Sequence, residues 1–242
     1  MVELTKNVQG VGASITGQRH ERAGIVCEDA FGLKRYSWGF VAVIADGLGS
    51  RQKACKGAQA AIRAGLLLGQ LWRRTGRKSC DDSLRHLFYA LWRTEIYPDA
   101  PQDCATTGHV FVCDGYAKSG LYVGVGDGAV LLKLHDQTEN LVKETKAYSN
   151  VTSCLHMEAC IANIAVRALD TNNGHLKLLM CTDGIADDLL LYKYDTFFET
   201  AYQRYMHLPH RSAQALLRRD LRSWPVVSHG DDRTMVVVST MT

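Results

Sequence analysis

Apolar and polar positions along the chain follow two periods, one typical of strands and the other of helices. Apolar runs rich in β-branched residues predict strands at 8–16, 40–45, 105–113, 120–125, 130–134, 160–168 and 176–181, and a last strand that ends at Ser239. Apolar residues at helical spacing predict helices at 52–75, 81–96, 194–205 and 212–223. The apolar stripe of the first helix is mostly Ala and Gly, so we expect this helix to lie close against a sheet.

The segments between these elements also have patterns that predict local structure. The polar stretch 17–22 is predicted to be a loop. Gly-Asp-Gly at 126–128 lies between two strands and predicts a hairpin turn. Residues 136–158 are polar and irregular, and Ser212 is the predicted N-cap of the last helix.

Acidic residues recur where the predicted strands end. The strand at 40–45 ends in Asp46, a later strand ends just before Asp183, and a glycine that allows a sharp turn follows each acid. Asp187 lies one helical turn after Asp183, so both carboxylates can face the same side. Further acids stand at strand ends or turns: Glu28, Asp29, Asp127, Asp231 and Asp232.

Each of these acids alone also fits a structural role, as a helix N-cap or a turn residue. Together they raise a question of charge, because carboxylates gathered without a counter-charge repel one another. Either they lie apart in the fold or a cation lies among them. An oxygen-only donor set favours Mg²⁺ or Mn²⁺, and none of the eight cysteines forms the Cys-x-x-Cys pair typical of zinc sites. Two such ions can activate a water for displacement at phosphorus, so the pattern predicts phosphate ester hydrolysis.

Composition limits the other function classes. The chain has 242 residues, 46% hydrophobic and 22% charged, which is typical of a soluble protein with one domain over 1–242. A formal net charge of +3 is too small to indicate nucleic acid or a membrane as a partner, and without an apolar signal segment we expect a cytoplasmic protein. No Walker-type loop, Gly-x-Ser-x-Gly elbow or cysteine-phosphatase loop is present, which disfavours nucleotide-driven transfer, acyl hydrolysis and cysteine-based phosphatase chemistry.

Six short motifs follow one another along the chain. They are Glu-Asp-Ala, Asp-Gly-x-Gly, a Thr-containing strand, Gly-Asp, Asp-Gly-x-x-Asp and a final acidic pair before a strand, at 27–30, 45–50, 105–107, 125–128, 181–187 and 231–237. In this order they resemble the motifs of the metal-dependent type 2C Ser/Thr protein phosphatases, most of all the compact bacterial branch.

The resemblance implies an α+β fold, a four-layer α-β-β-α sandwich of two antiparallel sheets with helices outside. It also implies that Asp46 bridges two Mg²⁺ or Mn²⁺ ions and that a bridging hydroxide attacks the phosphorus in one step. A flap would fall at 136–158. The resemblance implies these further metal-site residues: the Gly47 carbonyl, Asp183 and Asp231 on the first ion, Glu28 and Asp29 on metal-bound waters, and Asp127 and Asp187 at a third ion.

The sequence departs from the family pattern in several places. Gly24 stands where many members have a phosphate-binding Arg, and the preceding stretch offers Arg19 and Arg22 as substitutes. His20 could protonate the leaving alkoxide, or could equally be a surface loop histidine. Asp232 stands where the family often has Asn. Two smaller departures are Ser50 for the second Gly of Asp-Gly-x-Gly-Gly and Gly-Ala at 128–129 for Ser-Arg.

We therefore predict a monomeric phosphatase that acts on phosphoserine and phosphothreonine in proteins, opposite a cognate Ser/Thr kinase. Two alternatives stay open on sequence grounds. One is a catalytically inactive module of the same fold that binds phosphoproteins. The other is a hydrolase of small phosphate esters.

Overall fold

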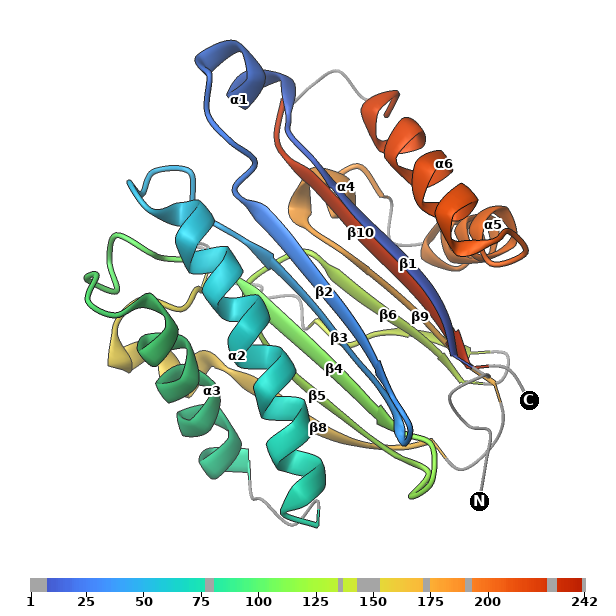
Figure 1. Cartoon of the computed structure of the whole chain (residues 1–242), viewed down its shortest axis with the longest axis horizontal. Coiled ribbons are helices and arrows are strands. Elements are labelled where there is room, and N and C mark those ends of the chain that lie inside the picture. Colours follow the sequence, from blue (N-terminus) through green and yellow to red (C-terminus); the bar gives the residue numbers. More distant parts are fainter. Residues whose placement is uncertain are drawn as a thin grey trace.

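The computed structural model describes residues 8–76, 81–134, 137–142, 153–171, 175–189, 193–225 and 230–240. Ten strands in these ranges form two antiparallel sheets of five strands each, which pack against each other between the helices (Figure 1). In order across the first sheet, the strands are β1 (Val8–Ile15), β10 (Arg233–Thr240), β9 (Leu176–Cys181), β6 (Ala129–Leu134) and β7 (Gln137–Asn140). In order across the second sheet, they are β2 (Asp29–Tyr36), β3 (Gly39–Asp46), β4 (Gly108–Asp114), β5 (Ser119–Val125) and β8 (Ala165–Asp170).

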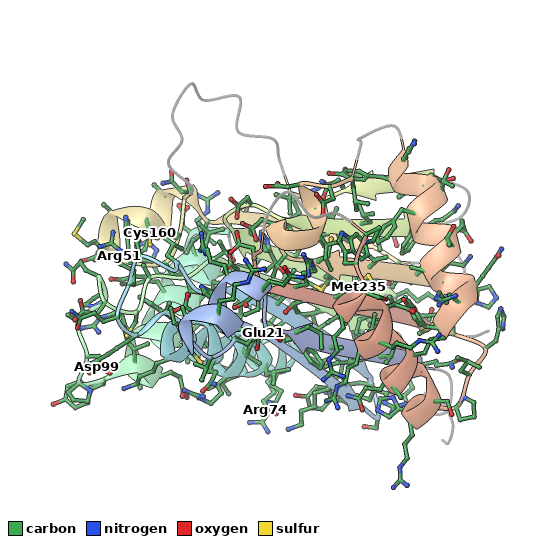
Figure 2. All side chains as sticks on the ribbon, turned by 90° about the horizontal axis from the view of Figure 1, so that it is seen from above. Glu21, Arg51, Arg74, Asp99, Cys160 and Met235 are labelled. Carbon is green, nitrogen blue, oxygen red and sulfur yellow. The ribbon has the colours of Figure 1, made fainter. Side chains whose placement is uncertain are left out.

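Helices cover the outer face of each sheet (Figure 1). Those over the second sheet are α2 (Ala54–Arg74) and α3 (Asp81–Ile96), and those over the first are α5 (Tyr194–Tyr205) and α6 (His210–Arg222). The shorter helical segments are α1 (Gln18–Ala23), α4 (Asp183–Ala186) and the 3₁₀ helix η2 (Glu158–Asn163). Figure 2, seen from the α1 end, shows α1 with Glu21 lying between the two outer helical layers.

Buried apolar residues fall into three clusters, one for each interface between layers. The middle cluster lies between the sheets, where Phe40 and Phe111 of the second sheet stack at 6.0 Å and pack with Val236 of the first. Apolar area is therefore removed from water on both faces of each sheet, which explains why the strands have nearly continuous apolar runs. The four-layer α-β-β-α sandwich implied by the sequence resemblance is confirmed.

Helix α2 lies close against the second sheet, as its small apolar stripe predicts. A Cβ added at Gly69 would lie 2.6 Å from Val41 Cγ2, and one at Gly65 would lie 2.7 Å from Val110 Cγ2. The N-terminal end of α2 lies equally close to the end of β3, because a Cβ added at Gly47 would lie 2.6 Å from the Ala54 backbone carbon.

Several local predictions are wrong. The predicted loop 17–22 is helix α1, which ends where Gly24 adopts a left-handed conformation with φ 68°. The predicted hairpin at 126–128 is a crossover, because β5 and β6 belong to different sheets. Gly126 and Gly128 have φ of 113° and 94°, so the change of direction depends on residues without a Cβ.

Other differences concern element ends. The strand predicted from 105 begins at Gly108, and the one predicted from 160 begins at Ala165, after η2. The N-cap of α6 is Pro209, not Ser212. Within the predicted flap, 137–140 form β7 and η2 begins at Glu158, whereas 136 and 143–152 lie outside the described residues.

Replacing Gly57 of α2 by Ala tests the close packing of this helix. Ala favours a helix interior over Gly by about 1 kcal/mol, but its Cβ would lie 1.9 Å from the Cys104 carbonyl oxygen. We expect Gly57→Ala to lower the free energy of unfolding by about 1–3 kcal/mol, as overpacking does. Urea denaturation measures this change. The exposed Gln59→Ala on the same helix is the control, and a Gly57→Ala protein more stable than wild type would contradict the packing.

Candidate metal centre and active site

An acidic pocket of about 170 Å³ lies where both sheets end, below α1. Seven carboxylic acids line it, drawn from segments far apart in the sequence. Its lining residues are Arg19, His20, Glu28, Asp29, Asp46, Gly47, Leu48, Gly49, Thr107, Asp127, Asp183, Asp231 and Asp232.

Three of these carboxylates form the centre of the pocket. Asp46 is the last residue of β3, Asp183 is the first residue of α4, and Asp127 lies in the crossover between the sheets. One carboxylate oxygen from each lies within 4.8 Å of the others. Oxygens at this spacing can share a divalent cation.

Hydrogen bonds from neighbouring threonines hold the end of β3 in place. The Asp46 N–H donates to Thr107 Oγ1 at 2.9 Å, and the Asp46 carbonyl accepts from Thr107 N and from Thr106 Oγ1, each at 2.8 Å. Asp29 pairs with Asp46 across β2 and β3, and its Oδ2 accepts from Thr182 Oγ1 at 2.7 Å. The carboxylates are thus fixed by backbone and hydroxyl groups, and their oxygens can still face the pocket.

A buried histidine supports the crossover that carries Asp127. His109 Nε2 lies 2.7 Å from the Asp127 carbonyl oxygen, and Nδ1 lies 3.0 Å from the Tyr122 hydroxyl. Burial lowers the pKa of His109, so the ring is neutral. The neutral ring has one N–H, which Nε2 donates to the carbonyl, while Nδ1 accepts from the Tyr122 hydroxyl.

Burial and mutual repulsion raise the pKa values of the central acids. Burial raises the pKa of Asp46 well above its ordinary value, and Asp29 and Asp183 add to the shift. The pKa of Asp29 rises to about 7 and that of Asp183 to about 6, in both cases chiefly through burial. A bound cation would offset this unfavourable charge.

The residues present fit a hard divalent cation. The donor set consists of carboxylate and carbonyl oxygens, which Mg²⁺ and Mn²⁺ prefer. Glu28 Oε2 is buried without a hydrogen-bond partner among the described residues, as expected of an oxygen that completes its contacts through a metal-bound water. A Cβ at Gly47 would lie 2.6 Å from the Ala54 backbone carbon, so this position requires glycine.

Asp232 and His20 form a buried network beside the centre. Asp232 Oδ1 accepts from Gly17 N at 2.7 Å, and Oδ2 accepts from Glu28 N at 2.6 Å. His20 is 5% exposed; its Nδ1 lies 3.0 Å from Asp232 Oδ2 and its Nε2 lies 3.6 Å from Glu28 Oε2. The alternative of a surface loop histidine is therefore wrong. Asp232 instead ties α1 to the segment before β2.

The structure gathers most of the residues that the sequence singled out. Arg22 lines a neighbouring cleft instead, and Asp187 is exposed after α4 and is not among the residues lining the acidic pocket. Sequence reasoning missed Thr182 and His109, because a hydroxyl or a histidine beside a strand gives no sign of its partner. The gathered residues are Arg19, His20, Glu28, Asp29, Asp46, Gly47, Asp127, Asp183 and Asp231.

Comparison with known proteins identifies the class to which this fold and site belong. The family model for protein phosphatase 2C matches residues 16–224. The chain therefore belongs to the protein phosphatase 2C family. No curated protein matches it by sequence. None of the helices in the described ranges combines the length and apolar character that a bilayer crossing requires.

Solved structures with the same fold are distant in sequence. The photosystem II phosphatase PBCP is 13% identical with a TM-score of 0.64, covering 97% of this chain and 99% of that one. RsbX in complex with magnesium is 13% identical with a TM-score of 0.59, covering 99% and 98%. The catalytic domain of the Ser/Thr protein phosphatase PstP, crystallised with two manganese ions, is 16% identical with a TM-score of 0.58, covering 98% and 99%. Family and fold together support a metal-dependent Ser/Thr phosphatase activity.

The raised pKa values predict how metal and pH act on stability. Aspartates in the unfolded chain ionise near pH 4, whereas Asp183 and Asp29 ionise at about 6 and about 7 in the fold. The unfolded state therefore loses these protons first, and the free energy of unfolding of the metal-free protein should fall as the pH rises from about 4 to about 7. Mn²⁺ competes with protons for the carboxylates, so it should raise Tm more at about pH 8 than at about pH 5.

Differential scanning fluorimetry with EDTA and with Mn²⁺ measures both effects. The control is Asp81→Asn, which removes an exposed acid at the start of α3 and should leave the Mn²⁺ response unchanged. A Mn²⁺ shift of equal size at both pH values would contradict the prediction.

Proposed function

We propose that this protein hydrolyses phosphoserine and phosphothreonine in other proteins, using two Mg²⁺ or Mn²⁺ ions and optionally a third. The observation that carries the proposal is the group of three carboxylates within 4.8 Å, from β3, the crossover and α4, in the acidic pocket of a protein phosphatase 2C chain. An inactive phosphoprotein-binding module would not need this group, and no observation favours that alternative.

The proposed ligands are those that the family resemblance implies, and all of them except Asp187 line the pocket. Asp46 lies at its centre and would contact both ions, with the Gly47 carbonyl, Asp183 and Asp231 on the first. Asp127 would hold a third ion with Asp187, and Glu28 and Asp29 would orient bound waters. Bound ions of this kind would supply an activated water for direct attack at phosphorus and would offset the charge of the phosphate.

Arg19 is the proposed substitute for the missing phosphate-binding Arg. It lines the acidic pocket, and its side chain is 65% exposed. Its one ion pair among the described residues is a 3.4 Å contact with Asp231 Oδ1, whose side chain is itself 38% exposed. An exposed pair of this kind is worth little, so the guanidinium can turn toward phosphate oxygens at low cost.

His20 is the proposed proton donor to the leaving group. Asp232 accepts its Nδ1–H, which orients the ring. The other nitrogen, Nε2, lies on the side of the ring that faces Glu28 in the pocket and would carry the proton that is donated. A serine or threonine alkoxide leaving the phosphorus would take this proton.

Asp46→Ala tests the proposed centre. Losing the central ligand should reduce turnover more than about a thousandfold, because the charge stabilisation by both ions is lost. Hydrolysis of p-nitrophenyl phosphate and of a phosphothreonine peptide would be followed with Mn²⁺, with Mg²⁺ and with EDTA. Circular dichroism confirms that the variant is folded, and EDTA should stop the wild type. Full activity in folded Asp46→Ala would disprove the proposed centre.

His20→Asn separates proton donation from structural support. The Asn amide can still donate to Asp232, but it cannot release a proton. We expect kcat for the phosphothreonine peptide to fall about 10²–10⁴-fold. Turnover of p-nitrophenyl phosphate should change much less, because p-nitrophenolate leaves as a stable anion. Equal losses on both substrates would show that His20 only holds the network together.

A further inference from the structure

A second cleft adjoins the acidic pocket along α1. It has a volume of about 410 Å³ and opens to solvent. Arg19 lines both the pocket and the cleft, so the two hollows are neighbours that meet at this side chain. The cleft is lined by Gln18, Arg19, Arg22, Ala23 and Gly230.

The charge of this cleft is opposite to that of the pocket. Among the residues that the structure describes, its lining carries two guanidinium groups and no carboxylate. Arg22 is exposed and makes no ion pair with any residue in the described ranges. Arg presents donors that match a carboxylate in two-point geometry. The small residues Ala23 and Gly230 leave the rest of the wall free of bulky side chains.

The cleft wall is held rigidly relative to the catalytic acids, although α1 is short. The Arg19 N–H donates to the Gly230 carbonyl at 3.0 Å, directly before Asp231. Gly17 N is bound to Asp232, as described above. Arg22 therefore keeps a fixed place one helical turn from Arg19, with Cβ atoms about 5–6 Å apart.

We propose that this cleft binds an acidic side chain of the substrate, near the phosphorylated residue. This inference rests on the proposed function and adds a substrate class to it: phosphoproteins with Asp or Glu close to the phosphosite. An extended peptide advances about 3.3–3.6 Å per residue. With the phosphate at Arg19, a carboxylate two residues away reaches Arg22. Glu21, on the same helix, is not among the described residues that line the cleft.

The test compares two phosphothreonine peptides of otherwise identical sequence. One has Glu, and the other has Gln, at the second residue before and at the second residue after the phosphothreonine. We expect the wild type to have a kcat/KM about three- to tenfold higher for the Glu peptide, the range for an exposed charge pair aided by its neighbour. Arg22→Glu should abolish or reverse this preference. The preference is the ratio of kcat/KM for the Glu peptide to kcat/KM for the Gln peptide in the same protein, so a general loss of activity does not change it.

The matched control is Arg74→Glu, which makes the same charge change at the exposed C-terminal end of α2. That end lies at the opposite end of the sheets from α1 (Figure 1), so the preference should survive. Equal kcat/KM values for the two peptides in wild type, or an unchanged preference in Arg22→Glu, would overturn the proposal.

A binding measurement separates this proposal from the proposed function. Fluorescence anisotropy measures the affinity of each labelled peptide for folded Asp46→Ala, which should not hydrolyse them. The Glu peptide should bind more tightly than the Gln peptide. Failure of the wild type to hydrolyse both p-nitrophenyl phosphate and the phosphothreonine peptides with any metal would disprove the proposed function alone. Equal binding of both peptides would disprove the cleft alone.

Discussion

Repulsion among buried carboxylates is the constraint around which the rest of this structure is arranged. The fold brings acids from five separate segments into one pocket and raises the pKa values of Asp29, Asp46 and Asp183 by burial. Such an arrangement is unfavourable unless stiff elements hold it. The apolar core between the sheets and the threonine hydrogen bonds around Asp46 supply that stiffness. Stability elsewhere in the fold thus maintains a charge distribution suited to divalent cations.

The patterns along the sequence predict several elements well, whereas the four layers follow only from the resemblance to the family. Strand β9 and helices α3 and α5 begin and end at the predicted residues, because each has a clear apolar period bounded by polar residues. The acids at strand ends were equally visible, and the motif order identified the family. Local patterns sufficed wherever one element buries one continuous apolar face.

What the sequence did not reveal depends on partners far along the chain. The 17–22 stretch has no apolar stripe, and its helix is fixed by Asp232, 215 residues after Gly17. The burial of His20 follows from the same contact. The crossover at 126–128 resembled a hairpin because Gly-Asp-Gly suits both, and only the sheet order separates them. His109 looked like one more strand residue, since nothing local indicates that it faces the Asp127 carbonyl.

The crossover has a mechanical consequence. Asp46 belongs to one sheet, Asp183 follows a strand of the other, and Asp127 lies on the chain that joins them. The spacing of the three carboxylates is therefore set by how far one sheet can slide over the other. A slippage of a fraction of an ångström, too small to unfold the sandwich, would be transmitted directly to the centre. The packing of Phe40 and Phe111 against Val236 of the other sheet thus helps to set the spacing of the carboxylates, although neither ring is among the residues that line the pocket.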